Sequence, residues 1–262
     1  MNFINPNLYP ALFLGLSLSV VGNYSQVWGQ SLKNWQFVGL LGLLVLPFAS
    51  IAGYYLHFFE PPIWYIEWRS LPYTEISVGL VGWVVGYFCK KLIQEPFPSL
   101  FLGALISAGL VFLPFLKPIL RPIRLPLTDK WQAEVCLQSC ASTCGAASLA
   151  TLFKLQQLHR TEPEIAQNAY SCGSGTEIWY LLRYARAQGL KLNPLIINSL
   201  EDLQKPALLG TSIGANYGHF VVFLGKTAKG YQIADPLKGS LQLSPTEFQN
   251  LYTLHPIAYE CP

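Results

Sequence analysis

A glutamine and a cysteine near the middle of the chain have the types and spacing that nucleophilic attack on a carbonyl needs. Gln138 lies six residues before Cys144, which opens a run rich in Ala and Leu that continues through Leu155. This run contains strong helix formers and predicts a helix beginning at or just after Cys144. The unpaired N–H groups of a first helical turn favour a negative charge, and the reactive thiolate carries one. The amide of Gln138 could donate to an oxyanion at the same place.

A histidine and an aspartate further along the chain supply the acid–base chemistry that such a nucleophile requires. The turn between two strand-like segments is centred between Thr227 and Ala228, which predicts that His219 lies opposite Asp235 to within one residue. Cross-strand side chains on one face lie about 5 Å apart at Cβ, within reach of a hydrogen bond. An Asp that holds one imidazole nitrogen leaves the other free to take a proton from a nucleophile.

Each of these residues also has a simpler interpretation. A cysteine at a helix start often packs as a small buried side chain, and a His–Asp pair at a strand end is often only solvated. His159 and His255 are weaker candidates for the base, because the first lies at the far end of the Cys144 helix and the second lacks a close acidic neighbour.

The other cysteines do not indicate a metal centre or another cofactor. Three cysteines recur every four residues, but the paired Cys-x-x-Cys spacings of zinc sites are absent and no nearby His completes a set. A disulfide stays open among four residues, which are Cys136, Cys140, Cys172 and Cys261.

The composition indicates a membrane protein. Of 262 residues, 52% are hydrophobic and 12% are charged, where a soluble domain carries about 25% charged residues. The net charge of +3, without a run of Lys or Arg, does not favour nucleic acid as a partner. Gly225-Lys226-Thr227 resembles the end of a phosphate-binding loop, but that pattern requires Gly at the position of Phe220, so no ATP site is expected.

Apolar segments in the N-terminal half predict about four transmembrane helices, at residues 8–21, 37–59, 76–89 and 98–116. The first is short, and a signal peptide is its alternative. No Lys or Arg precedes it and no clear cleavage site follows, so a retained span is favoured. Gly82 and Gly86 in the third segment form a Gly-x-x-x-Gly pair, which allows close contact between helices.

Three regions follow: transmembrane helices over residues 1–117, a Pro-rich basic linker over 118–126 and a soluble α+β domain over 127–262. Pro recurs every four residues at the linker, and repeated Pro does not continue a regular helix. Basic side chains around the linker suit anionic lipid headgroups. With four spans, four basic residues lie on the side of the soluble domain and three on the other, which favours a cytoplasmic domain. A working thiolate also prefers a reducing compartment.

The soluble domain is expected to combine helices with an antiparallel sheet. Thr161-Glu162-Pro163-Glu164 has the pattern of a helix start, and a second helix over residues 177–188 is closed by Gly189. Strands are expected at five places, which are residues 190–197, 206–212, 219–224, 230–234 and 240–243.

With these residues in this order, the region 127–262 resembles the bacteriocin-processing, double-glycine leader peptidases. These are papain-like cysteine peptidases that are often fused to peptide-exporting ABC transporters. The similar stretches are Gln138 before Cys144-Gly145, Gly218-His219-Phe220-Val221-Val222, Ala234-Asp235-Pro236-Leu237-Lys238-Gly239 and Leu243-Ser244-Pro245-Thr246-Glu247-Phe248.

The resemblance implies a papain-like fold and a catalytic role for four residues. Cys144 is the implied nucleophile, His219 the general base and then acid, and Asp235 the residue that orients His219. Gln138 and the backbone N–H of Cys144 would bind the oxyanion. Cleavage after Gly-Gly in a leader peptide is implied, with membrane lipids and a separate ABC transporter as further partners.

Two alternatives fit the same region. One is a catalytically idle peptide-binding module that serves a separate exporter. The other is an acyltransferase that uses the same triad but passes the acyl group to an amine instead of water.

Overall fold

The computed structural model describes residues 4–28, 51, 53–54, 57–214 and 217–262. The chain divides into two compact units. The helical unit comprises the described part of Ile4–Pro62 together with Leu71–Leu120, and the C-terminal unit comprises Ile63–Ser70 together with Arg121–Pro262.

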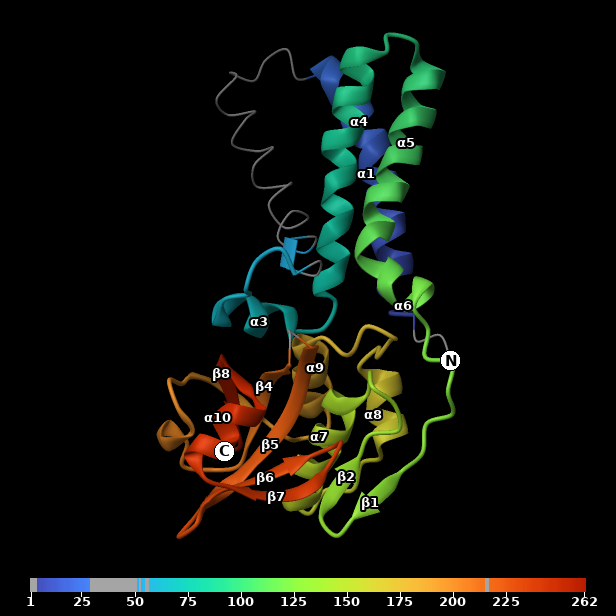
Figure 1. Ribbon diagram of the computed structural model, residues 1–262. Helices are drawn as coiled ribbons and strands as arrows, with labels where there is room; N and C mark the ends of the chain where they lie inside the picture. Colours follow the sequence, from blue (N-terminus) through green and yellow to red (C-terminus); the bar gives the residue numbers. More distant parts are fainter. Residues whose placement is uncertain (1–3, 29–50, 52, 55–56, 215–216) are drawn as a thin grey trace. The chain divides into compact units, whose positions relative to one another are not determined.

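The described part of the helical unit contains three longer helices and several short helical pieces (Figure 1). The longer ones are α1 (Leu8–Trp28), α4 (Val81–Leu92) and α5 (Pro96–Phe112). A 3-10 segment, η2 (Thr74–Leu80), leads directly into α4. A second 3-10 segment, η3 (Leu113–Phe115), and the short α6 (Leu116–Leu120) continue α5.

Glycines allow α1 and α4 to pack backbone against backbone. A Cβ added at Gly82 would lie 1.9 Å from the carbonyl oxygen of Gly15, and one added at Gly86 would lie 1.9 Å from that of Ser19. No side chain fits at either position. The prediction that this Gly-x-x-x-Gly pair permits close helix contact is confirmed.

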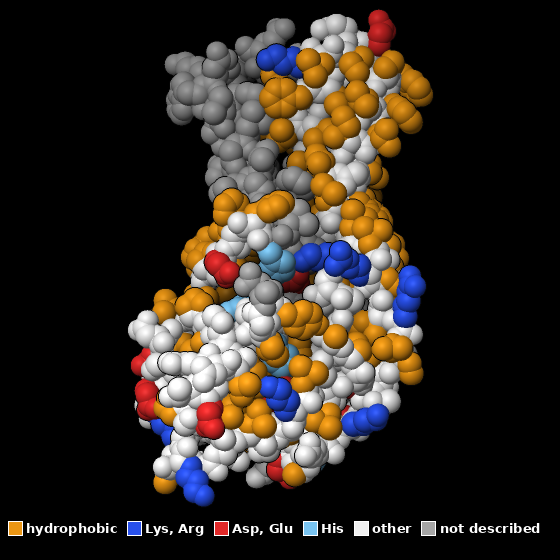
Figure 2. Space-filling model, in the orientation of Figure 1, with side chains coloured by type: hydrophobic (Ala, Val, Ile, Leu, Met, Phe, Trp, Pro, Cys, Tyr) orange, Lys and Arg blue, Asp and Glu red, His pale blue; other side chains and the backbone are white. Residues whose placement is uncertain are grey.

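Large apolar side chains cover the outside of the helical unit, and small residues lie inside it. Phe97, Phe101 and Leu105 of α5 are more than half exposed, whereas Ser99 and Ser107 of the same helix are fully buried. Figure 2 shows hydrophobic side chains spread over the visible face of this unit. Among the described residues, one helical stretch, Pro96–Leu120, is long and apolar enough to cross a membrane by length and composition. The predicted span at residues 37–59 lies mostly outside the described residues.

The first part of the predicted Pro-rich linker is helical rather than extended. Pro114 lies at the start of η3, and Pro118 lies in the first turn of α6. Proline is compatible with a first helical turn, because the N–H group it lacks has no partner there within the helix. The helical path therefore ends at Leu120, three residues beyond the boundary expected from the sequence.

The C-terminal unit contains a six-stranded antiparallel sheet with the strand order β3-β8-β4-β5-β6-β7. The strands are β3 (Asn193–Ile196), β4 (Ala207–Ile213), β5 (Tyr217–Thr227), β6 (Gly230–Asp235), β7 (Gly239–Leu243) and β8 (Thr253–Glu260). A separate two-stranded ribbon joins β1 (Lys130–Gln132) to β2 (Val135–Leu137). The helices are α3 (Ile63–Arg69), α7 (Cys144–Leu155), α8 (Glu162–Asn168), α9 (Ile178–Ala187) and α10 (Pro245–Leu251), with the 3-10 turn η4 (Leu200–Asp202).

This architecture confirms the predicted α+β class with an antiparallel sheet. α7 begins at Cys144, and α8 begins after Thr161, whose side chain accepts a hydrogen bond from Glu164 N. Gly189 closes α9 with a φ of 88°, a backbone conformation that favours glycine. Five of the strands were predicted, with different ends, whereas β1, β2 and β8 were not.

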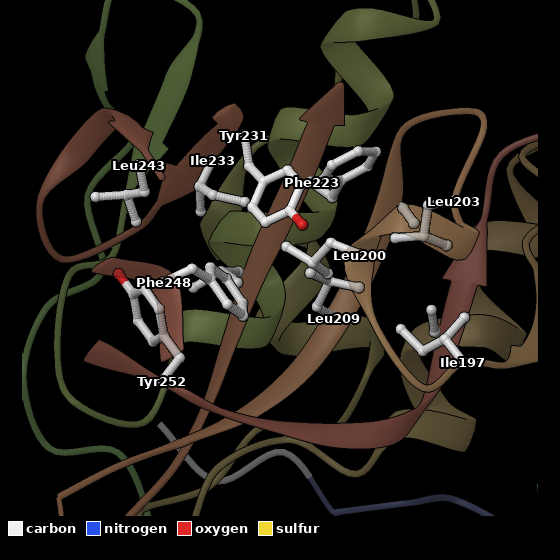
Figure 3. Packing of buried hydrophobic residues seen from close by; sticks show 13 residues of the cluster. Ile197, Leu200, Leu203, Leu209, Phe223, Tyr231, Ile233, Leu243, Phe248 and Tyr252 are labelled. Carbon is white, nitrogen blue, oxygen red and sulfur yellow. The ribbon is translucent and has the colours of Figure 1, made fainter. Parts of the chain in front are cut away.

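An apolar cluster of aromatic and aliphatic side chains lies between the sheet and α10. The rings of Tyr231, Phe248 and Tyr252 follow one another, with centroid separations of 6.2 Å and 5.2 Å. Figure 3 shows Phe223 beside Tyr231. The cluster continues through Leu209 and neighbouring residues of β4 and β8. It fixes the position of Tyr252, which also reaches the functional site described below.

Residues 63–70 pack with the C-terminal unit, although the sequence assigned them to the N-terminal membrane region. The ring of Tyr65 contacts that of Trp179 in α9, with centroids 6.0 Å apart. The guanidinium of Arg69 lies 5.1 Å from the Trp179 ring centroid and 5.9 Å from that of Tyr180. Arg183 Nη2 donates to the Arg69 carbonyl oxygen at 2.7 Å. Aromatic residues that the sequence alone would place in the membrane region therefore belong to a packed core.

Candidate active site

Cys144 is the first residue of α7, with 5% of its surface exposed. The side chain of the preceding Thr143 does not cap the helix. The first-turn N–H groups of α7 are therefore not occupied by a side-chain cap and can favour a negative charge on the Cys144 sulfur. Gly145 permits close packing behind this turn, since a Cβ there would lie 2.8 Å from Leu181 Cδ1 and 3.2 Å from Phe220 Cδ2.

His219 and Asp235 form a buried pair in the sheet. His219 Nε2 lies 2.8 Å from Asp235 Oδ1, and the side chains are 1% and 0% exposed. The backbone N–H of Leu237 also donates to Oδ1 at 2.8 Å, and Tyr252 Oη donates to Oδ2 at 2.6 Å. The carboxylate is thus held from three directions, by β5, by the turn after β6 and by the residue that ends α10.

The register between these strands differs from the one predicted. β5 extends to Thr227 and β6 begins at Gly230, so the turn is centred one residue later than expected, and a bulge between Phe223 and Gly225 shifts the pairing. Gly225 adopts a φ of 152°, which suits a bulge. Val222 then pairs with Ala234, so that His219 lies diagonally from Asp235 instead of opposite it. Diagonal neighbours on one face remain within reach of a long side chain.

His219 and Asp235 each shift the pKa of the other toward the charged form. Burial alone would lower the pKa of His219, but the hydrogen bond to Asp235 and the proximity of Cys144 raise this pKa to about 9. Burial alone would raise the pKa of Asp235, but hydrogen bonds from His219, Tyr252 and the Leu237 N–H lower it below its ordinary value. The arrangement therefore favours an imidazolium next to a carboxylate.

The second nitrogen of the imidazole points away from the carboxylate. His219 Nδ1 is buried and has no hydrogen-bond partner within the described part of the chain. Asp235 is hydrogen-bonded to Nε2, and Cys144 is close enough to the same ring to raise the pKa of His219. Nδ1 is therefore the nitrogen that is available to exchange a proton with the sulfur. The structure thus brings together three of the residues singled out from the sequence.

Gln138 lies beside the same group. Its backbone N–H donates to the Pro236 carbonyl at 3.0 Å, which ties it to the turn that follows Asp235. Its Nε2 donates to the Cys140 carbonyl at 2.8 Å. An amide nitrogen has two hydrogens, so one donor stays available to a further acceptor.

Two tyrosines at the site were not predicted from the sequence. Tyr217 Oη donates to the Ala141 carbonyl at 3.0 Å, and burial together with the nearby Cys144 and Cys140 raises its pKa. The only sequence signal for it is the two-residue spacing from His219, which places both on one face of a strand. Tyr252 gives no such signal, because it reaches Asp235 only through the packing of α10 against the sheet.

The remaining histidines and cysteines lie elsewhere or form no further centre. His255 Nε2 lies 2.9 Å from Ser212 Oγ, and His159 lines a surface hollow with Trp131 and Lys154. All six cysteines fall within the described residues, and no two of them form a disulfide. The described residues contain no cluster of three His, Cys, Asp or Glu side chains arranged to hold a metal ion.

Comparison with known proteins gives one family match. The model of the Peptidase C39 family matches residues 132–261. An uncharacterised protein from Methanothermobacter thermautotrophicus is 27% identical over 128 residues, which is 49% of this chain and 89% of that protein. An uncharacterised protein from Methanothermobacter marburgensis is 27% identical over 116 residues, 44% of this chain and 80% of that protein.

Solved structures that are similar to this chain include two peptidases. The peptidase domain of Streptococcus ComA, a bifunctional ABC transporter involved in quorum sensing, is 20% identical, with a TM-score of 0.43 over 48% of this chain and 94% of that one. A double-glycine-motif protease from an AMS/PCAT transporter, solved with its leader peptide, is 25% identical, with a TM-score of 0.43 over 53% and 98% of the two chains.

Proposed function

We propose that this protein hydrolyses peptide bonds with Cys144 as nucleophile and His219 as base, because the model of the Peptidase C39 family matches residues 132–261. Asp235 orients the imidazole, and Gln138 binds the oxyanion. The observation that carries this assignment is the position of His219. Its Nε2 lies 2.8 Å from Asp235 Oδ1, and the nearby Cys144 raises the pKa of the same buried ring.

In the reactive form, His219 Nδ1 holds the proton of the Cys144 thiol, so that an imidazolium lies beside a thiolate. The thiolate attacks the carbonyl carbon of the scissile bond, and the carbonyl oxygen becomes an oxyanion. The Cys144 N–H and the free N–H of the Gln138 amide stabilise this charge. The imidazolium gives its proton to the leaving amine, which leaves a thioester on Cys144.

Hydrolysis of the thioester completes the cycle. His219 removes a proton from a water molecule, which attacks the thioester carbonyl. Collapse of the second tetrahedral intermediate releases the carboxylate product, and the sulfur leaves as the thiolate. Asp235 keeps its charge throughout, because its role is to hold the ring and to favour the imidazolium.

The proposed substrate is a peptide with a double-glycine leader, cleaved after Gly-Gly. The support is the resemblance of residues 127–262 to leader peptidases in the stretches around Gln138, Cys144, His219 and Asp235. A peptide exporter would be the natural partner, since such leaders accompany exported peptides, and a separate ABC transporter is proposed in that role.

The helical unit is proposed as a multi-pass membrane anchor with the peptidase on the cytoplasmic side. Its support is the distribution of side chains, with Phe97, Phe101 and Leu105 exposed and small residues at the helix contacts. Such an inverted distribution is typical of helices that pack within lipid.

The assignment is tested by incubating the purified full chain with a synthetic leader peptide and measuring the product masses. We expect cleavage after Gly-Gly by the natural chain and none by Cys144→Ala. Peptide binding without cleavage by the natural chain would instead indicate an idle binding module. Adding a primary amine separates hydrolysis from acyl transfer, because only transfer yields a product with the added mass of the amine.

A further inference from the structure

A buried carboxyl group contacts the loop that connects Gln138 with Cys144. Glu162, the first residue of α8, is fully buried. Ser139 N donates to its Oε1 at 2.8 Å, and Ser139 Oγ lies 2.6 Å from its Oε2. The Thr143 hydroxyl donates to the Cys140 carbonyl at 3.1 Å and lowers the pKa of this carboxyl. Glu162 therefore holds Ser139 directly and lies near Thr143, at the two ends of residues 138–143, which we call the oxyanion loop.

The hydrogen bonds of Ser139 Oγ indicate whether the Glu162 carboxyl is ionised or protonated. This hydroxyl lies 2.8 Å from the Thr128 carbonyl, accepts from Thr128 N at 2.8 Å, and lies 2.6 Å from Glu162 Oε2. It has one hydrogen and two lone pairs. If Glu162 is ionised, two acceptors compete for that single hydrogen. If Glu162 is protonated, it donates to Oγ, Oγ donates to the carbonyl, and these three contacts are all satisfied; a fourth neighbour, Thr128 Oγ1, lies 3.2 Å from Oγ.

The charges around Glu162 also favour a neutral acid. Burial and the like charge of Asp129 raise the pKa of Glu162. Asp129 Oδ1 in turn accepts from Glu162 N at 3.4 Å. On β2, burial is the main cause that raises the pKa of the Cys136 thiol to about 12, so the thiol is neutral near pH 7.

The other charged groups on neighbouring elements pair among themselves. Lys154 of α7 lies 3.2 Å from Glu134, and Arg160 lies 3.6 Å from Glu164 on α8. The strongest charge effect on Glu162 is therefore repulsive, since Asp129 has the same sign.

We propose that Glu162 acts as a neutral carboxylic acid and is the positioning residue of the oxyanion loop. It does not touch the substrate. It fixes Ser139, which follows Gln138, and lies near Thr143, which precedes Cys144, and thereby sets the separation between the oxyanion donor and the nucleophile. The inference rests on the proposed function for its catalytic consequence, while the protonation of Glu162 can be measured without any activity.

Ionisation of Glu162 is expected to lower the stability of the folded protein. The folded protein holds the pKa of Glu162 above its ordinary value of about 4.3. The stability that the neutral acid contributes is complete below that ordinary pKa and is lost as the pH rises through the raised pKa. Over the same range the Oε2–Ser139 bond loses its hydrogen, and the oxyanion loop loosens.

Three variants of the full chain test this inference. Glu162→Gln keeps an acceptor for Ser139 N and a donor for Ser139 Oγ but does not titrate. Glu162→Ala removes both. Glu164→Gln is the matched control, because Glu164 lies on the same helix and contacts Tyr184 and Arg160 instead of the loop.

We expect Glu162→Gln to stay close to the natural chain in kcat/KM at low pH and to lack the loss of activity that follows ionisation of Glu162. Glu162→Ala should lose about 10²-fold in kcat/KM, the loss that follows removal of one oxyanion donor. The control should keep the natural pH profile. If Glu162→Gln loses as much as Glu162→Ala, the carboxylate is the working form and the inference is wrong.

A second measurement does not depend on cleavage. The carboxyl carbon of Glu162, followed by NMR during a pH titration, should report a pKa above the ordinary value, and an ordinary value would overturn the inference. The unfolding free energy of the natural chain should fall relative to that of Glu162→Gln as the pH rises. If the natural chain never cleaves a peptide, the proposed function fails, yet these two titrations still decide the protonation of Glu162.

Discussion

Tyr252 Oη lies 2.6 Å from Asp235 Oδ2, the carboxylate oxygen that His219 does not use. The Tyr252 ring packs against Phe248 with centroids 5.2 Å apart, so the apolar cluster under α10 holds the hydroxyl in place (Figure 3). The carboxylate that bonds to the imidazole is therefore itself held in place by the hydrophobic core of the domain.

We expect Tyr252→Phe to reduce kcat/KM about tenfold, because it removes one hydrogen bond to a buried charge, worth about 1.5–3 kcal/mol. The ring remains, so the apolar packing is kept. The pKa of Asp235 should rise without this donor, and the acid limb of the kcat/KM profile should move to higher pH. Peptide cleavage measured across the acid range checks this shift.

Tyr184→Phe is the matched control for that prediction. Tyr184 Oη donates to Glu164 Oε1 at 2.7 Å, which is the same type of contact at a distance from the nucleophile. Its loss should lower the unfolding free energy without moving the pH profile. An equal shift of the acid limb in both variants would mean that Tyr252 acts on stability alone.

The raised pKa of His219 predicts an alkaline limit to activity. The imidazolium that protonates the leaving amine is present below a pKa of about 9 and is lost above it. The stability that this charged pair contributes is complete below the ordinary pKa of about 6.5 and disappears as the pH rises through the folded value. Cleavage rates and unfolding free energies should therefore both decline toward pH 9 and above.

Asp235→Asn should lower the pKa of His219, because it removes the carboxylate that stabilises the imidazolium. We expect the alkaline limb to move to lower pH and kcat to fall by roughly 10²–10⁴-fold, as for loss of an orienting carboxylate in other triads. An NMR titration of the His219 ring measures the shift directly. An unchanged ring pKa would contradict the role given to Asp235.

The sequence was most informative where a local pattern decides the structure. The helix start at Cys144 follows from the run of helix formers after it, and α8 follows from the cap at Thr161. The diagonal offset of His219 was not predictable, because it depends on a bulge at Gly225 that shifts the register by a single residue. β8 was missed because its strand character depends on pairing with β3 and β4 on either side.

Contacts between segments that are far apart in the sequence could not be predicted, because no local sequence pattern indicates them. Glu162 was recognised only as part of a helix start, yet its carboxyl reaches Ser139, 23 positions earlier. Tyr252 reaches Asp235 across 17 positions because α10 folds back over the sheet. The packing of residues 63–70 against the C-terminal unit was not predicted for the same reason, since their aromatic composition is equally typical of a membrane interface and of a packed core.

Gly82→Ala is predicted to disrupt the helical unit. The added methyl carbon would lie 1.9 Å from the Gly15 carbonyl oxygen, so α1 and α4 must move apart. Gly109→Ala is the control, since nothing lies within 4 Å of the Cβ at that position. Thermal unfolding of the purified chain in detergent should show a lower midpoint for the first variant only. Equal midpoints would contradict the close α1–α4 packing.

Arg69→Lys is predicted to destabilise the C-terminal unit by about 1–2 kcal/mol, because an ammonium cannot stack as a planar guanidinium does between Trp179 and Tyr180. Arg186→Lys, an exposed change on the same helix α9, should alter the unfolding free energy by less than about 0.5 kcal/mol. Urea unfolding followed by tryptophan fluorescence compares the two. Equal effects would mean that the stacked geometry of Arg69 contributes nothing.

The inclusion of α3 in the C-terminal unit constrains how this enzyme can be recombined with other chains. A fragment cut at residue 121 would keep Cys144, His219 and Asp235 but would leave Trp179 and Tyr180 uncovered where Tyr65 and Arg69 now pack. Transplanting the peptidase onto a foreign anchor therefore requires carrying an eight-residue piece from between the apolar segments. Residues 121–262 alone therefore do not form the complete C-terminal unit, which also includes residues 63–70.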